Sequence, residues 1–231
     1  MKIHNFFISD QIGDQSRFEV DDSDLINQWR HVLRFNTGST VVLFDNSGFE
    51  YLVQFAELTY LKAVFIILEK RKNKFEPKKE IFLFQSLIKT DRFEWILEKG
   101  TELGVAHFVP VLAKQSVAKK INMIRSRKIL KEASEQSGRG VLPTISETVS
   151  LENALDSVST PALVFDPSGL SFHNSSFIIH NSISVFIGPE GGWTEPELEM
   201  MRAKNIPIFS LGTQILRAET AAIAISSLML L

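Results

Sequence analysis

The 231-residue sequence contains no cysteine, no long apolar run and no marked excess of charge of one sign. Without cysteine there is no disulfide framework, no thiolate zinc site and no cysteine nucleophile. No run reaches the roughly 18 apolar residues of a membrane-spanning helix, and the first residues lack the apolar stretch of a signal peptide. We therefore expect a cytoplasmic protein with no membrane segment.

The near-neutral total charge hides an uneven distribution. Counting 25 Lys and Arg against 27 Asp and Glu gives a formal net charge of −2, whereas nucleic-acid-binding domains usually carry a basic excess. Residues 69–79 nevertheless carry a net charge of +4, and residues 114–139 carry +6. Such runs are usually solvated faces. The alternative is a surface that contacts RNA phosphates, because these contacts dominate nucleic-acid affinity.

The first 70 residues show mainly strand patterns. Four β-rich runs stand at residues 3–8, 40–44, 49–55 and 61–68, and the second and third flank a turn of the composition Asp-Asn-Ser-Gly. One helix begins near Asp22–Asp24 and shows the apolar spacing of Leu25, Trp29, Val32 and Leu33. This predicts a small β-barrel with one inserted helix over residues 1–70, followed by a polar linker at 71–79 that contains Pro77.

From residue 80 onward strands and helices alternate. Strands are expected at 80–87, 106–112, 161–166, 176–180, 183–187 and 206–211. Helices are expected from Thr90 or Asp91 to Gly104, over 121–137 and 150–158, after the capping box that starts at Thr194, and from about Glu219. The alternation predicts an α/β domain over residues 80–231 with a mainly parallel sheet.

Two glycine-containing loops follow strands of this predicted sheet. The first is IGPEGGW at 187–193, and the second is LGTQILRAET at 211–220, which places Arg217 just before a helix. Glycines after strands often mark only tight turns. The alternative is a ligand site, because open α/β sheets bind ligands at the carboxyl ends of their strands and helix N-termini favour negative charge. The five histidines are scattered without ligand spacing, so no metal site is expected.

At five stretches the sequence resembles the bacterial RsmE family of 16S rRNA uridine-N3 methyltransferases, which belong to the SPOUT class. They are RHVLR (30–34), QSLIKTDRFEWILEKGTELGV (85–105), EASEQSGR (132–139), IGPEGGW (187–193) and LGTQILRAETAAIA (211–224). The resemblance implies a PUA-like RNA-binding barrel before an α/β domain with a C-terminal trefoil knot. It also implies a homodimer that uses S-adenosylmethionine (SAM), needs no metal, and acts on the small ribosomal subunit at the family target, uridine 1498.

The resemblance also implies roles for particular residues. The cofactor site would comprise Leu163, Phe165, Gly188, Pro189, Glu190, Gly191, Gly192, Leu211, Gly212, Ile215, Leu216 and Arg217. RNA would contact Arg30, His31, Arg34, Lys114, Ser116, Lys119, Lys120 and Arg139. Catalysis is assigned to Arg217, which would stabilise charge developing on the uracil, and to Glu190 or Glu219, which would accept the N3 proton or orient Arg217.

Three positions depart from the pattern of many relatives. Gln115 and Gln214 stand where arginine is common, and Trp193 stands where phenylalanine is common. Two other classes of protein stay open on the residues alone. One is a non-catalytic RNA-binding protein with a degenerate α/β domain, and the other is an α/β enzyme that acts on a small molecule.

Overall fold

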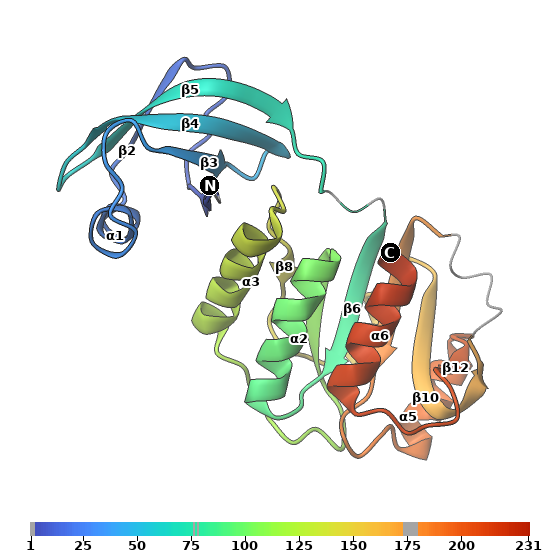
Figure 1. The fold of residues 1–231 in the computed structure, drawn as a ribbon. Helices are drawn as coiled ribbons and strands as arrows, with labels where there is room; N and C mark the ends of the chain where they lie inside the picture. The colour runs from blue at the N-terminus through green and yellow to red at the C-terminus, as the bar shows by residue number, and fades with distance from the viewer. Residues whose placement is uncertain (1–2, 76, 78, 173–179) are drawn as a thin grey trace. The chain divides into compact units, whose positions relative to one another are not determined.

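The computed structural model describes residues 3–75, 77, 79–172 and 180–231, and the chain divides into two units (Figure 1). The first unit comprises residues 1–76 together with Ser134–Leu142, and the second comprises Pro77–Ala133 and Pro143–Leu231. In the described ranges, no helix is both long enough and apolar enough to cross a membrane.

The first unit is built on a five-stranded sheet. Its elements are β1 (Asn5–Phe7), β2 (Arg17–Val20), α1 (Ser23–Asn27), the π-helix η1 (Gln28–Val32), β3 (Thr40–Phe44), β4 (Phe49–Leu58) and β5 (Ala63–Lys72). The strand order is β1-β3-β4-β5-β2, and only the β1–β3 pair is parallel. Among the described residues no pairing joins β1 to β2, so the sheet is open and the predicted closed barrel is not confirmed.

The predicted hairpin is confirmed as β3 and β4. Asn46 and Gly48 adopt positive φ in its turn, as the Asp-Asn-Ser-Gly composition suggests. The following strand, β5, was expected to end at residue 68 but runs to Lys72, into the predicted linker. It continues through polar residues because they pair with the neighbouring strand: Arg71 donates to the buried carboxylate of Glu50.

The predicted helix is present, but its second half is a π-helix. Asp22 caps α1 by accepting from the backbone N–H groups of Asp24 and Leu25. Trp29 is fully buried, and its ring meets Phe55 and Phe65 edge-on, so it anchors this helix on the sheet. The wider turn of a π-helix rotates later side chains away from the α-helical face. For this reason Val32, predicted to be buried, is 73% exposed.

The second unit is an α/β domain whose sheet is parallel throughout its described pairs, as predicted. Its strands are β6 (Glu80–Ser86), β7 (His107–Leu112), β8 (Thr144–Ile145), β9 (Val149–Ser150), β10 (Ala162–Ser171), β11 (Ser182–Ile187) and β12 (Ile208–Ser210). Its helices are α2 (Thr90–Leu103), α3 (Met123–Ser137, which continues into the first unit), α4 (Leu151–Asp156), α5 (Glu195–Ala203) and α6 (Ala218–Leu230). The order is β12-β10-β11-β6-β7-β8, with β9 also paired to β7.

Most predicted element ends agree with this structure. Gly104 ends α2 in the left-handed conformation, and the Thr194–Glu197 capping box starts α5. The start of α2 differs, because its N-cap is Lys89 and neither Thr90 nor Asp91 caps it. The strand expected at 176–180 falls almost wholly outside the described residues.

Helices cover both faces of the parallel sheet. Successive strand residues point to opposite faces, so Leu83, Leu163 and Val185 pack with α2 and α6, while Phe84, Val164 and Phe186 pack with α4 and α5. Figure 1 shows α2 and α6 side by side. Because β12 is an edge strand and α6 packs against α2, the connecting loop passes along the carboxyl ends of the strands.

Candidate functional site

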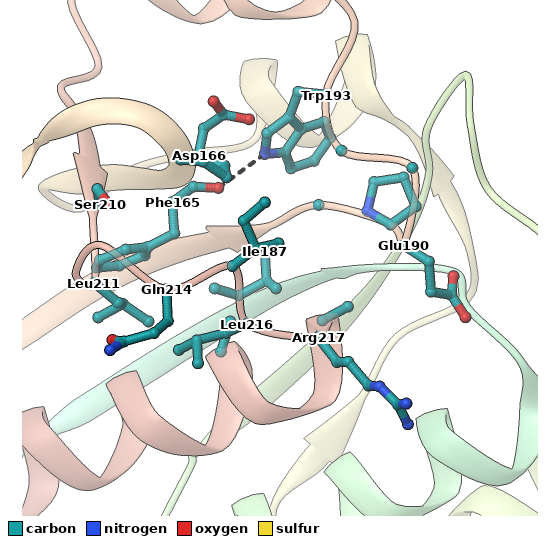
Figure 2. A pocket seen from close by; sticks show the side chains of 18 of the residues that line it. Phe165, Asp166, Ile187, Glu190, Trp193, Ser210, Leu211, Gln214, Leu216 and Arg217 are labelled. Carbon is teal, nitrogen blue, oxygen red and sulfur yellow. Dashed lines mark hydrogen bonds between the residues drawn. The ribbon is translucent and has the colours of Figure 1, made fainter.

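A pocket of about 460 Å³ lies where β10, β11 and β12 end, which is the edge at which the sequence places its two glycine loops. This volume suits a small-molecule ligand. Its lining comprises Arg92, Phe165, Asp166, Pro167, Ile187, Gly188, Pro189, Glu190, Gly191, Gly192, Trp193, Ser210, Leu211, Gln214, Ile215, Leu216, Arg217, Ala218 and Ala221 (Figure 2). The two loops therefore form one site.

The first loop needs glycine at specific positions. A Cβ on Gly188 would lie 3.1 Å from Nε1 of Trp193, whose indole is fixed because it donates to the Phe165 carbonyl at 3.2 Å. A Cβ on Gly191 would lie only 2.1 Å from Oε1 of Gln115. Gly192 has a φ of +77°, which side chains disfavour. All three glycines line the pocket, so this part of its wall is formed by backbone.

Two carboxylates tie this loop to its neighbours. Glu190 accepts from the backbone N–H of Lys89 at 3.3 Å, which joins the loop to the start of α2. Glu197, which is buried, accepts from the N–H of Thr194 and from the N–H of Lys114, each at 2.7 Å. The capping box of α5 thus also holds the segment that follows β7. The loop is positioned before any ligand arrives.

The second loop exposes apolar side chains at the pocket. Ile215 is 86% exposed and Leu216 is 38% exposed, and both line the pocket with Leu211. Arg217 is the N-cap residue of α6 and is also exposed. A ligand that covered these side chains would remove apolar surface from water. The start of α6 would add a preference for negative charge nearby.

A second cation enters the pocket from α2. Arg92, in the first turn of that helix, lies with Nη1 3.5 Å from Oε1 of Glu219. Glu219 is buried in the first turn of α6, and its Oε2 atom has no hydrogen-bond partner within the described part of the chain. Arg92 was not among the residues predicted for the site. The available signal was its place within the matching stretch 85–105.

Most of the predicted cofactor residues lie together in this pocket. The exceptions are Leu163, which is fully buried in the core between sheet and helices, and Gly212, which lies beside the lining residues. Glu219 does not line the pocket either and contacts Arg92. Further lining residues, at the strand ends, in the two loops and in α6, were not among those predicted: Asp166, Pro167, Ile187, Trp193, Ser210, Gln214, Ala218 and Ala221.

Comparisons with known proteins agree with this site. A model of the RNA methyltransferase domain matches residues 75–230. The chain is 30% identical to the ribosomal RNA small subunit methyltransferase E of Bacillus subtilis, covering 91% of this chain and 88% of that protein. The chain belongs to the RNA methyltransferase family. Membership confirms the predicted family and enzyme class, a SAM-dependent RNA methyltransferase.

Further relatives of this methyltransferase show the same similarity over nearly the whole chain. The ribosomal RNA small subunit methyltransferase E of Rickettsia conorii is 28% identical, covering 96% of this chain and 93% of that protein. A crystal structure of the Neisseria gonorrhoeae enzyme of that name, bound to SAM, superposes with a TM-score of 0.90 at 26% identity. It covers 99% of this chain and 97% of the other. The similarity therefore extends over both units.

The predicted RNA-binding residues of this methyltransferase differ in their exposure. His31, Arg34, Lys114, Lys119 and Lys120 are exposed, and Arg30 is partly exposed. The guanidinium of Arg30 lies 3.3 Å from the ring centroid of Tyr60, an exposed aromatic that sequence reasoning did not select. RNA bases stack on aromatic rings and on arginine planes, so this pair is a candidate RNA contact.

Two of the predicted RNA-binding residues are buried instead. Arg139 is 5% exposed and Ser116 is 6% exposed. The Ser116 hydroxyl accepts from the Ala113 N–H at 3.0 Å and so closes the turn after β7. In this structure, therefore, Ser116 shapes the basic segment, and Arg139 adds little charge to the surface.

Proposed function

We propose that this protein transfers a methyl group from SAM to N3 of a uridine in 16S rRNA of the small ribosomal subunit. The observation that carries the proposal is the pocket of about 460 Å³ built from both glycine loops at the carboxyl ends of the parallel strands. The similarity to a small-subunit methyltransferase bound to SAM supports it. The equivalent of uridine 1498 is the proposed target.

The lining suits the chemical groups of SAM. Its apolar side, with Phe165, Leu211 and Leu216, fits an adenine ring, while the backbone amides of the first loop fit the polar edges of the nucleoside. SAM supplies a methyl group that is already activated by the sulfonium charge, and N3 must lose its proton as it takes that methyl group.

We assign the charge stabilisation to Arg217. N3 of uridine carries a proton near neutral pH, and negative charge spreads over N3 and its flanking carbonyls as the proton leaves. Arg217 lies at the start of α6, so its guanidinium and the helix N-terminus would act on this charge together. Glu190 lines the same pocket and is exposed, so we assign it as the acceptor of the N3 proton.

We assign Glu219 a different task. Its carboxylate is buried and is paired with Arg92 instead of facing solvent. The pairing fixes the carboxylate of Glu219 and the guanidinium of Arg92 relative to each other. We therefore infer that Glu219 positions Arg92, and that it does not accept the proton.

RNA would be bound by the exposed basic residues of both units. In the first unit these are His31 and Arg34, with the partly exposed Arg30 beside them, and in the second they are Lys114, Lys119 and Lys120. The first unit would act as the PUA-like RNA-binding module. Phosphate contacts of this kind make affinity fall steeply with salt.

Further family features complete the proposal. A knot is supported by the passage of the chain from the edge strand β12 back to α6, which packs against α2. We also propose a homodimer, with the exposed apolar side chains of α2 and α6 at its interface, Trp95 at 45% and Leu228 at 56%. Light scattering of the full chain would measure a mass of twice 26.1 kDa if it dimerises. We place the protein in the cytoplasm with its substrate.

The decisive experiment maps modified nucleotides in 16S rRNA. A methyl group on N3 blocks base pairing, so reverse transcription stops one nucleotide before it. We expect this stop in the wild-type strain, its loss when the gene is deleted, and its return when the gene is restored. A stop that persists in the deletion strain would contradict the proposal. Calorimetry with SAM tests the alternative of a non-catalytic RNA-binding protein, which predicts that SAM does not bind.

A further inference from the structure

Positive charge lies on one side of the pocket. Figure 2 shows Arg217 and Glu190 on that side, and Phe165 and Leu211 on the other, together with the polar side chains of Asp166, Ser210 and Gln214. Arg92 is tied to the side that carries positive charge, because its helix begins at Lys89, whose N–H donates to Glu190. A ligand with an apolar ring at one end and a charged group at the other would match this division.

The two cations on the side that carries positive charge are held differently. The Arg92 side chain is 28% exposed and faces the carboxylate of Glu219 across 3.5 Å. Arg217 is exposed, at the end of its loop. Arg92 is therefore less exposed and lies beside a carboxylate before binding, whereas Arg217 is accessible to a large partner that arrives from solvent.

Arg92 also keeps donors for a ligand. A guanidinium carries five N–H donors in a planar fork that suits carboxylates. The separation of 3.5 Å from Glu219 is longer than an ordinary charged hydrogen bond, so this pair does not occupy the fork. Glu219 offsets the charge of Arg92 in the partly buried site, and its unpartnered Oε2 atom shows that the polar groups here are incompletely satisfied within the described residues.

We propose that Arg92, held by Glu219, binds the carboxylate of the methionyl part of SAM and so determines cofactor specificity. This inference rests on the proposed function. If the adenine lies against Phe165 and Leu211, the amino-acid end reaches the side that carries positive charge, where Arg92 meets a small carboxylate. The exposed Arg217 is then left for the base of the RNA.

The test compares two probes that differ in the amino-acid end. S-adenosylhomocysteine carries the carboxylate, and 5′-methylthioadenosine lacks the whole amino-acid end. We expect Arg92→Gln to weaken the homocysteine compound about 10- to 100-fold by calorimetry and to leave methylthioadenosine within about twofold. Arg125→Gln is the matched control, because Arg125 pairs with Glu94 of α2 and is absent from the pocket lining within the described ranges. It should change neither affinity.

Each of the other possible outcomes would overturn either this inference or the proposed function. An equal loss of affinity for both probes would mean that Arg92 only supports the pocket. An unchanged affinity for the homocysteine compound would mean that Arg92 does not contact the carboxylate. Either result overturns the inference. Failure of the wild-type protein to bind either probe would instead refute the proposed function. Circular dichroism of both variants distinguishes misfolding from a lost contact. Arg92→Lys keeps the positive charge but not the planar fork of donors, so it should recover part of the affinity for the homocysteine compound.

Discussion

The two loops of the pocket are held in opposite ways. The loop at 187–193 is fixed by its own chain, through Glu190 on Lys89 and Trp193 on the Phe165 carbonyl. The loop at 211–217 leaves Ile215 and Leu216 exposed. The first loop is organised in advance, which lowers the entropy cost of binding. The second offers apolar surface that a ligand covers. Substitutions in the two loops should therefore separate stability, binding and catalysis.

The largest effect is expected at the end of the second loop. Arg217→Ala should lower the rate of methyl transfer more than about 100-fold, because it removes charge stabilisation that is needed only in the transition state. SAM affinity should stay within a few-fold. Single-turnover assays with 16S rRNA or the small subunit measure the rate, and calorimetry measures the affinity.

Arg202→Ala is the matched control for this prediction. Arg202 is an exposed arginine of α5 that pairs with Glu195 and does not line the pocket in the described part of the chain. It should leave the rate unchanged. Normal turnover by Arg217→Ala would end the assignment of Arg217, and a loss shared by both variants would indicate a general effect of charge on RNA binding.

An intermediate effect is expected in the first loop. Gly192→Ala should lower the free energy of unfolding by about 1 kcal/mol, because alanine disfavours the φ of +77° at that position. It should also weaken SAM binding about 10-fold, because relief of the strain moves backbone that lines the pocket. Thermal unfolding and calorimetry measure the two quantities.

Gly13→Ala is the matched control, because it introduces similar backbone strain at a position outside the pocket. Gly13 has a φ of +63°, and, like Gly192, an added Cβ there would meet nothing within 4 Å. It should lose similar stability and keep full SAM affinity. If Gly192→Ala behaved as Gly13→Ala does, the first loop would serve the fold alone.

Periodicity and turn chemistry predicted most of this architecture. The apolar runs at β6, β10 and β11 are long enough to identify buried parallel strands. The short strand β2 (Arg17–Val20) was missed, because two apolar residues in four give too little pattern. Val32 was misplaced because spacing alone does not distinguish an α-helix from a π-helix.

The site was predictable where the signal is local. Glycines and a proline after a strand identified the first loop, whose close contacts explain their presence. Arg92 was missed because a single arginine on an amphipathic helix also fits a solvated face. Its pairing with Glu219, far away in the sequence, arises only when α2 and α6 pack together. Burial of Ser116 and Arg139 is likewise a tertiary effect.

The smallest effect is expected at the most exposed apolar residue of the second loop. Ile215→Ala should leave the free energy of unfolding unchanged within about 0.5 kcal/mol, because the side chain is 86% exposed and so contributes little to packing. It should weaken SAM binding about 3- to 10-fold, since the ligand would no longer cover the removed methyl groups. Leu170→Ala, at a 76% exposed position of β10 that is absent from the described pocket lining, should change neither quantity. A loss of stability without a loss of affinity would reverse the contrast between the loops, because the second loop would then depend on Ile215 for its own structure.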